Sequence, residues 1–508
     1  MKKISLEQSR RNLARRRRKV AARHARAGHW GARPKPMLNA GKVSYEVGGN
    51  VEATCFGGVA AVHRLVRRLG LAERIDADLE LLKVHLPYHE SDHVLTLAYN
   101  VLCGGTRLED IERLRHDTAF MNALGAELIP DPTTAGDFCR RFTPADVETL
   151  MEAINTVRPA LWDGRGRDRL GPVAYIDTDG TIAPTYGEHK AGMDISYKGI
   201  WGYAPLIVSL ANTKEVLYLV NRPGNAPSHK GAAEWIDRAV DLVTPHAAWV
   251  CLRGDTDFSL TAHFDRWAER VDFVFGMDAS AALKARAAAL DESCWQRLDR
   301  PPKHEPKTGQ TRARRANHKQ RIVTERGYLD ISLNHEDVAE FDYQPGKCDR
   351  PYRVVALRKN LTRSRGENVL FDDIRYFFYI TTRTDLTPAE VIACANDRCD
   401  QENVIEQLKN GVNALRVPLY DLVSNWAYMV IAALAWNLKS WWAMMLHRKD
   451  DRHTYIAMEF RRFIASVILV AAMIVRRARS ITIRIIGYTP SLGRFFSAWN
   501  TIERTRFG

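Results

Sequence analysis

The stretch that decides the fold is YIDTDGTIA, residues 175–183. Apolar residues lead into Asp177 and Asp179, and a glycine and a threonine follow directly. An apolar run that closes on a turn residue is typical of a buried β-strand. Because side chains alternate along a strand, both aspartates lie on the same face, and either can be the principal one. The stretch therefore predicts a strand whose carboxyl end carries a carboxylate site.

The residues that follow this strand indicate a mixed sheet. Three strand-like runs are joined by loops too short to hold a crossover helix, so they should form an antiparallel meander. Helical and strand-like runs then alternate. The order strand, strand, strand, helix, strand, helix, strand is that of an RNase H-like α/β fold. The predicted strands lie within residues 173–179, 203–212, 215–224, 247–258 and 271–278. Residues 229–243 are the predicted amphipathic helix.

The opening stretch also resembles the nucleophile motif of the haloacid dehalogenase phosphatases, in which an apolar run precedes Asp-x-Asp-Gly-Thr. That family needs a parallel, doubly wound sheet and a second acidic motif further along the chain. Here Ser259 and Leu260 stand where the second acidic residue should fall. A phosphatase is therefore a disfavoured alternative.

A second carboxylate comes from LRGDTDF, which contains Asp255 and Asp257. Asp255 lies at the end of the fourth predicted strand, which is next to the first strand in an RNase H-like sheet. Asp257, two residues further on, is the alternative. Neighbouring strand ends would bring Asp179 and Asp255 together.

A third carboxylate lies on a long helix predicted between a Thr387 cap and a Gly411 stop. Within it, Glu402 follows Arg398 by four residues and precedes Lys409 by seven. At about 100° per residue, these steps keep the three side chains on one stripe of the helix. Such a stripe is usually a solvated, salt-bridged face. Three carboxylates from two strand ends and a helix, however, suit two Mg²⁺ ions.

Jointly, DTDGT, LRGDTDF and DRCDQENVIEQLK resemble the DDE transposases of bacterial insertion sequences, over roughly residues 173–446. The branch they resemble carries a Tyr-x2-Arg-x3-Glu-x6-Lys signature and a β-rich insertion before the glutamate. The resemblance implies that Asp179, Asp255 and Glu402 are the catalytic metal ligands. The sequence departs from the signature at Ala395, where the tyrosine would fall.

The same resemblance implies a reaction and its partners. The enzyme would bind terminal inverted repeats in double-stranded DNA, cleave the transposon ends and join the 3′-ends to target DNA. It would act as a homodimer in the synaptic complex, with two Mg²⁺ ions for which Mn²⁺ can substitute. Arg398 and Lys409 would contact phosphates of the transposon end. A non-catalytic DNA-binding regulator with the same fold is the alternative.

An excess of basic residues also points to nucleic acid. The 508-residue chain has 74 Lys and Arg against 60 acidic residues, a formal charge of +14. Thirteen of the basic residues and one acid lie in residues 1–35, and a second basic loop spans residues 312–321. Cations that meet phosphates release condensed counterions, although such runs can also be solvated tails. The candidate DNA contacts are Arg15, Arg16, Arg17, Arg18, Lys19, Arg314 and Arg315.

Cysteine spacing and hydropathy bear on the compartment. The eight cysteines include no Cys-x-x-Cys pair and no Cys/His pair at zinc spacing, which predicts a reduced protein without structural zinc. Residues 463–475 are shorter than the ~20 residues of a membrane span, and residues 427–446 are interrupted by Asn437, Lys439 and Ser440. Both runs are expected to be buried helices. We expect a cytoplasmic protein, associated with the bacterial nucleoid and not with a membrane.

These observations predict an RNase H-like α/β catalytic core with a mixed sheet and a β-rich insertion, flanked by helical regions. The predicted organisation is a basic arm at residues 1–35, a helical DNA-binding region at 36–165, a catalytic domain at 166–277 and 370–415, the insertion at 278–369, and a C-terminal helical region at 416–508.

Overall fold

The computed structural model divides the chain into two compact units. The helical unit comprises Met1–Leu161, Asn410–Ala414 and Val430–Gly508, and the sheet unit comprises Trp162–Lys409 and Leu415–Met429. The structure describes residues 6–29, 31, 40, 43–46, 49, 51–163, 170–187, 189–300, 318–477 and 480–507.

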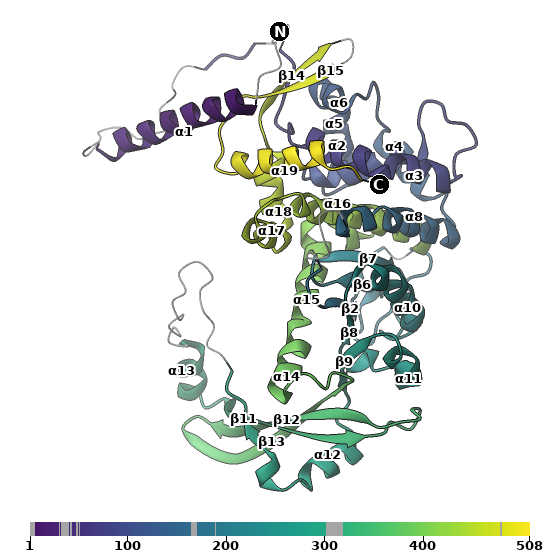
Figure 1. The fold of residues 1–508 in the computed structure, drawn as a ribbon, viewed down its shortest axis with the longest axis vertical. Coiled ribbons are helices and arrows are strands. Elements are labelled where there is room, and N and C mark those ends of the chain that lie inside the picture. The colour runs from purple at the N-terminus through teal and green to yellow at the C-terminus, as the bar shows by residue number, and fades with distance from the viewer. Residues whose placement is uncertain are drawn as a thin grey trace. The chain divides into compact units, whose positions relative to one another are not determined.

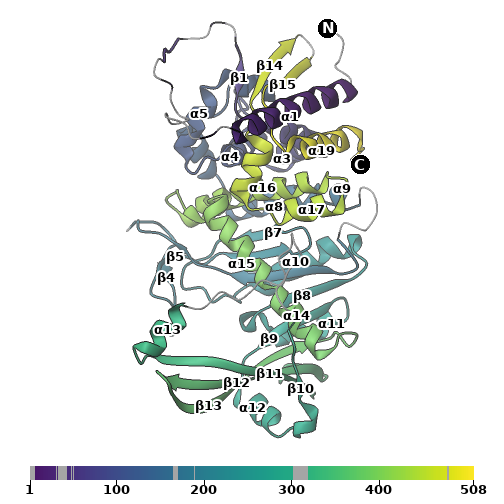
Figure 2. The same ribbon diagram turned by 90° about the vertical axis from the view of Figure 1, so that its left-hand side faces the viewer.

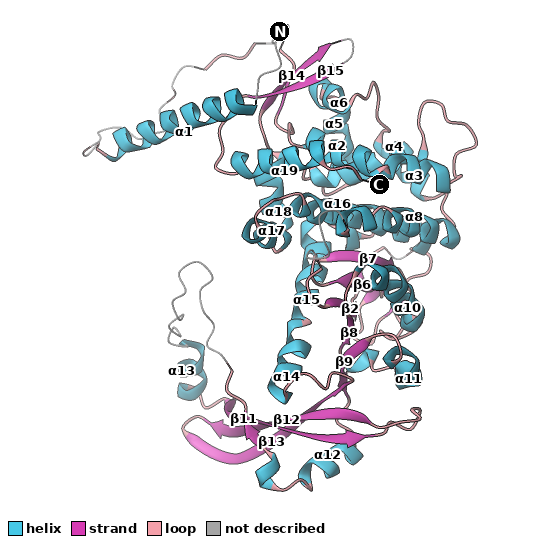
Figure 3. Cartoon of the chain, viewed as in Figure 1, coloured by secondary structure: helices cyan, strands magenta, loops and turns pink. Residues whose placement is uncertain are grey.

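A mixed sheet of nine strands forms the centre of the sheet unit, drawn in magenta in Figure 3. Its strand order is β10-β11-β12-β13-β9-β8-β2-β6-β7. The strands are β2 (Ala174–Gly180), β6 (Leu206–Leu210), β7 (Glu215–Val220), β8 (Val250–Gly254), β9 (Asp272–Met277), β10 (Gln296–Arg297), β11 (Leu329–Tyr343), β12 (Tyr352–Arg365) and β13 (Asn368–Thr381).

Strand direction follows whether a helix lies in the connection. β2, β6 and β7 are joined without helices and pair antiparallel, so the predicted meander is confirmed. Helices α10 (Ala232–Val243) and α11 (Phe264–Ala268) each connect two strands, and β2, β8 and β9 pair parallel. The antiparallel β2–β6 pair is incompatible with a parallel, doubly wound sheet. The phosphatase interpretation is therefore wrong.

Helices cover both faces of this sheet, as Figure 1 shows with α10 and α11 on one side and α14 and α15 on the other. The buried residues of α10 include Trp235, Ile236, Val240 and Val243, which recur at helical spacing and form its apolar stripe. On the other face, α14 (Pro388–Asp397) and α15 (Cys399–Glu406) run across the strands (Figure 2). Strands β6, β7 and β8 are buried at every position, which fits the continuous apolar sequences of β6 and β7, whereas many residues of β11 are exposed.

The residues predicted as a β-rich insertion extend the same sheet. They hold α12 (Ala281–Ala288), β10, α13 (His318–Glu325), β11 and β12. Long antiparallel ladders join β11 to β12 and β12 to β13, and β13 returns to pair with β9. The predicted return of a last strand to the sheet is thus confirmed. A separate three-stranded sheet consists of β3 (Ala183–Pro184), β5 (Trp201–Tyr203) and β4 (Asp194–Ile195).

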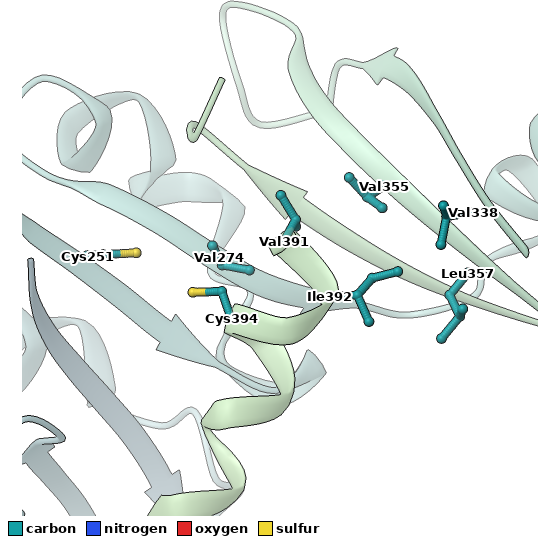
Figure 4. Close-up of a cluster of buried hydrophobic side chains, with 8 residues drawn as sticks. All are labelled: Cys251, Val274, Val338, Val355, Leu357, Val391, Ile392 and Cys394. Atoms are coloured by element: carbon teal, nitrogen blue, oxygen red, sulfur yellow. The ribbon is translucent and has the colours of Figure 1, made fainter. Parts of the chain in front are cut away.

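One hydrophobic cluster packs α14 against the parallel strands β8 and β9 and the antiparallel strands β11 and β12 (Figure 4). Val391 and Ile392 of α14 meet side chains from β8, β9, β11 and β12. In Figure 4 the sulfur atoms of Cys251 on β8 and Cys394 on α14 point toward one another. The full cluster is Cys251, Val274, Val338, Val355, Leu357, Val391, Ile392 and Cys394. The helix that leads into the signature region is therefore fixed by apolar packing.

The helical unit consists mainly of short amphipathic helices. Their bounds are α1 (Leu6–Gly28), α2 (Val59–Leu69), α3 (Leu71–Asp78), α4 (Glu90–Leu102), α5 (Ile111–Arg115), α6 (Thr118–Leu124), α7 (Pro132–Cys139), α8 (Pro144–Thr156), α17 (Lys449–Ile456), α18 (Phe460–Phe463) and α19 (Leu492–Arg504). Two further helices, α9 (Pro159–Trp162) and α16 (Leu422–Met444), have residues in both units.

The C-terminal region is not entirely helical, which corrects the prediction. Strands β14 (Ala472–Arg477) and β15 (Ser480–Ile485) form a sheet with β1 (Ala53–Thr54). The apolar run 463–475 was expected to be one helix. Its first residue is the last of α18, residues Ile464–Ile468 form a π-helical turn, and its last residues lie in β14. β-Branched residues such as Ile474 favour the strand, and periodicity alone does not separate a short buried strand from a helix.

The other apolar run lies within α16 and is buried, as predicted. Its polar residues Asn437, Lys439 and Ser440 are buried as well. Nζ of Lys439 donates hydrogen bonds to the carbonyls of Ile456, at 2.6 Å, and Met458, at 3.0 Å. Within the described part of the chain, no helix combines the length and apolar character of a membrane span.

Candidate active site

Asp179 and Asp255 lie at the ends of neighbouring parallel strands. The β2–β8 register pairs Asp177 with Arg253, so the residues two positions further along each strand reach the same edge of the sheet. Asp255 follows β8 directly and caps a 3-10 turn, accepting a hydrogen bond from the amide of Asp257 at 3.0 Å. Parallel strands place their carboxyl ends together, and the predicted adjacency of the two motifs follows from that geometry.

Glu402 is held beside β2 by its neighbour on α15. The side chain of Gln401 is buried and spans to β6, where its Nε2 donates to the carbonyl of Ile207 at 3.3 Å. Its Oε1 accepts a hydrogen bond from the hydroxyl of Ser209. Glu402 itself is exposed. The buried amide therefore fixes the turn of helix from which the glutamate projects.

The pKa of Asp179 indicates that the three predicted carboxylates interact. Burial raises the pKa of Asp179 to about 6; Arg398 opposes this shift, and Asp255 and Glu402 add to it. Nη1 of Arg398 lies 3.2 Å from Oδ2 of Asp179, and the amide of Gly180 donates to Oδ1 at 2.8 Å. The carboxylates of Asp255 and Glu402 thus lie close enough to Asp179 to repel its charge.

Asp255 shares this environment and adds a residue that the sequence analysis missed. Burial raises the pKa of Asp255, Arg398 opposes the shift, and Asp257 and Asp278 raise it further. Asp278 follows β9, the next parallel strand, so it ends a third strand at the same edge. Its position directly after VDFVFGM is the signal that could have identified it. Asp257, the alternative to Asp255, is exposed.

Asp177 has a different environment from Asp179. It is fully buried, and its two oxygens lie 2.7 Å from Nε and 2.9 Å from Nη2 of Arg253. Nη1 of Arg253 also donates to the carbonyl of Cys394 at 3.2 Å, which joins β8 to α14. Burial opposes the charge on Arg253, but Asp177 outweighs it and raises the pKa of Arg253. Arg253 therefore connects β2 and β8 to α14. An arginine within the apolar run of β8 was the sequence signal that could have indicated a buried ion pair.

The signature residues do not lie on one uninterrupted α-helix, which corrects the prediction. Thr387 caps α14 as predicted, through a capping box with Glu390. Arg398 stands at the junction of α14 and α15, and Lys409 lies in a π-helical turn, Gln407–Gly411. Such turns recur at functional sites because they rotate side chains relative to the preceding helix.

The two signature cations are less exposed than a solvated face would require. The side chain of Arg398 is 16% exposed. Burial lowers the pKa of Lys409; Glu406 opposes the shift, Lys198 adds to it, and Asp179 opposes it. Lys409 therefore lies within electrostatic range of Asp179. Ala395, at the position of the signature tyrosine, packs against the hydrophobic cluster of Figure 4.

The predicted basic contacts have mixed outcomes. Residues 15–19 lie on α1, and Arg16 donates to the carbonyls of Ile485, at 2.8 Å, and Gly487, at 3.0 Å. The side chains of Arg15, Arg17, Arg18 and Lys19 are exposed. Arg314 and Arg315 lie outside the described residues.

The donor set at the sheet edge fits hard divalent cations. Asp179, Asp255 and Glu402 supply only carboxylate oxygens, which suit Mg²⁺ or Mn²⁺ better than a soft metal. Nη1 of Arg398 donates a hydrogen bond to Oδ2 of Asp179, so an ion that binds this oxygen must compete with the guanidinium.

The chain is similar to a protein family and to solved structures. A family model described as Transposase DDE domain group 1 matches residues 36–507. Among solved structures, a piggyBac transposase synaptic complex with hairpin DNA matches with 8% identity, a TM-score of 0.36 and coverage of 83% of each chain. No curated protein matches. Because the family model spans nearly the whole sequence, the chain belongs to the group 1 DDE-domain transposases, enzymes that cleave and transfer DNA strands with divalent metal ions.

Proposed function

We propose that the chain is the transposase of a bacterial insertion sequence. It binds the terminal inverted repeats of its element, cleaves the ends and joins the 3′-ends to target DNA. The observation that carries this proposal is the sheet edge at which Asp179, Asp255 and Glu402 interact, beside Arg398. The enzyme would act at the nucleoid, as a homodimer that holds two element ends in one synaptic complex.

The strand order supports an RNase H-like catalytic core. Strands β7, β6, β2, β8 and β9 are adjacent in that order, with two antiparallel pairs followed by two parallel pairs. Helices α10 and α11 provide the crossovers. In such a core, the first and fourth strands end side by side and supply two carboxylates, while a helix on the sheet face supplies the third.

The chemistry assigned to this site is phosphoryl transfer with two Mg²⁺ ions. Two such ions activate an attacking water or 3′-hydroxyl and stabilise the leaving oxygen. Asp179, Asp255 and Glu402 would hold the ions, and the charge interactions of Asp179 with the other two carboxylates support this assignment. Arg398 and Lys409 are assigned to the phosphates of the bound end. Their positive charges would offset the negative charge of the DNA backbone. No covalent enzyme intermediate is needed, since positioning and charge stabilisation suffice.

A cleavage assay tests the function. Duplex DNA with the inverted repeats that flank the gene should be nicked in Mg²⁺ or Mn²⁺ and remain intact in EDTA. A scrambled end of equal length is the control for sequence recognition. Specific binding to the repeats without cleavage under any metal condition would instead favour the non-catalytic regulator.

Removing the signature cations should slow cleavage. Arg398→Ala and Lys409→Ala are each expected to lower the cleavage rate at transposon ends by tenfold or more, since a charge-assisted contact contributes roughly 1.5–3 kcal/mol. Both rates are measured under single-turnover conditions with saturating DNA. Arg238→Ala, which removes a half-buried helix cation paired with Glu234 in the same unit, is the matched control. Cleavage at the parent rate in both variants would mean that these cations only neutralise nearby carboxylates.

The exposed cations of α1 should contribute to the salt dependence of DNA binding. Replacing Arg15, Arg17, Arg18 and Lys19 together by glutamine should reduce the slope of log affinity against log salt by about 3.6, if each meets one phosphate. Arg16 is left in place because it holds the backbone near β15. The slope is measured by fluorescence anisotropy between low and physiological salt. An unchanged slope would identify this face of α1 as solvated surface.

A further inference from the structure

A second group of metal-binding side chains lies in the helical unit, where the segment after α3 enters α4. His85, His89 and Glu90 each present one ligand atom, and these atoms lie within 4.8 Å of one another. Among the residues that the structure describes, no other group of three His, Cys, Asp or Glu residues meets that spacing. The proposed transposition chemistry does not use these side chains.

Glu90 shows that this group needs a positively charged partner. Its side chain is buried, with the residue 1% exposed, although it stands in the first turn of α4. Oε1 accepts hydrogen bonds from the amides of Leu81, at 3.0 Å, and Leu82, at 2.9 Å. Oε2 is buried and accepts no hydrogen bond among the described residues. This oxygen faces Nε2 of His85, 3.1 Å away, and a buried carboxylate oxygen that accepts no hydrogen bond is costly, so the side toward the histidine marks a position for a ligand.

The histidines lie on the open side of that oxygen. Nε2 of His85 lies 3.1 Å from Oε2 of Glu90, and the rings of His85 and His89 stack with centroids 4.6 Å apart and planes 19° apart. Both histidines are exposed. One divalent cation can therefore be reached by both imidazoles and by the carboxylate.

The donor types select the class of metal. Two imidazole nitrogens and one carboxylate, with a position left for water, form a donor set typical of Zn²⁺ and related transition-metal ions. Mg²⁺ prefers oxygen donors, so this group differs in selectivity from the carboxylates at the sheet edge. The cysteine spacing predicts no structural zinc, but that pattern covers only sites that contain cysteine. A histidine–glutamate site needs no cysteine.

We propose that His85, His89 and Glu90 bind a zinc-like divalent transition-metal ion that fastens residues 79–89 to the first turn of α4. Glu90 already anchors one end of this segment through Leu81 and Leu82, and the ion would anchor the other end through His85. Between these two anchors and the helix, Val84 and Leu86 are exposed, at 64% and 84%. The ion would therefore hold an exposed apolar loop in a fixed position on this unit.

Zinc content of the full-length protein tests the proposal. The parent and a His85→Ala/His89→Ala variant are incubated with Zn²⁺, dialysed against metal-free buffer and analysed by mass spectrometry of the metal. The double variant should retain about one zinc ion per chain fewer than the parent, whatever binds at the sheet edge. His116→Ala is the matched control, because His116 is exposed and lies 3.0 Å from Glu112 without a second histidine. It should retain as much zinc as the parent.

A second measurement separates metal binding from folding. The double variant keeps the bonds from Glu90 to Leu81 and Leu82, so it should fold, whereas Glu90→Gln alters a buried group. Amide hydrogen exchange in residues 79–89 should slow at least severalfold when Zn²⁺ is added to the parent and should not change in the double variant. Equal zinc retention by parent and double variant overturns the site. Zinc retention without slower exchange overturns the proposed fastening of the loop.

Discussion

Glu402→Gln is expected to lower the rate of DNA strand cleavage by about a thousandfold, the effect of losing roughly 4 kcal/mol of transition-state stabilisation. The substitution keeps the size of the side chain and removes its charge. Glu402 is exposed, while Gln401 anchors the helix, so the fold should not change. Asp179→Asn and Asp255→Asn should have similar effects, since each removes a hard oxygen ligand. Rates are measured in Mg²⁺ on pre-cleaved and intact end duplexes.

Binding and a neighbouring aspartate provide the controls for this result. Affinity for end DNA should survive in all three variants, because the substitutions remove negative charge that repels phosphates. Asp257→Asn is the matched change, since Asp257 is exposed and interacts with Asp255. It should cleave within about tenfold of the parent. A Glu402→Gln enzyme that cuts at the parent rate would exclude Glu402 as the third ligand, and Asp278 would be tested next.

The second large effect is on stability. Asp177→Asn should lower the free energy of unfolding of the sheet unit by roughly 3–5 kcal/mol, because it leaves the charge of Arg253 buried without its counter-ion. Both side chains are almost completely buried, at 1% and 4% exposure. Urea denaturation followed by circular dichroism measures the change. Asp257→Asn, on the exposed turn after β8, should leave the transition within about 0.5 kcal/mol of the parent.

Removing both charges distinguishes a buried ion pair from a general packing defect. Asp177→Leu combined with Arg253→Met leaves no uncompensated charge and should recover much of the lost stability. Recovery should be incomplete, since Arg253 also donates to the carbonyl of Cys394. If the double variant is less stable than Asp177→Asn alone, the cost lies in packing and not in the unpaired charge.

The parts of the fold that depend on local pattern could be predicted from sequence. The antiparallel meander was predicted because no crossover helix was expected between its strands, and Thr387 was predicted as the cap of a helix. The adjacency of the Asp179 and Asp255 motifs followed from the strand order. Each of these needs only residues close in sequence, or a rule that connects the type of connection to strand direction. The five-part domain organisation and the roles of the site residues stay predictions.

The parts that depend on contacts between distant residues could not be predicted in the same way. The alternation of side chains along a strand placed Asp177 and Asp179 on one face. The ion pair between Asp177 and Arg253 depends on the register of β2 on β8, which the sequence does not give. The π-helical turn that carries Lys409 has no sequence pattern of its own. The C-terminal run 463–475 divides between helix and strand because it is too short for its periodicity to decide.

The ion pair of Asp179 and Arg398 joins residues 219 positions apart in the chain. A ribosome adds about 5–20 residues per second, so α15 emerges roughly 10 to 40 s after β2. The intervening strands can pair during that time, but no nascent chain contains the complete carboxylate cluster. We expect cutting activity to begin only after nearly the whole sheet unit has been translated. A truncated product of interrupted synthesis that ends before Glu402 should therefore not break DNA.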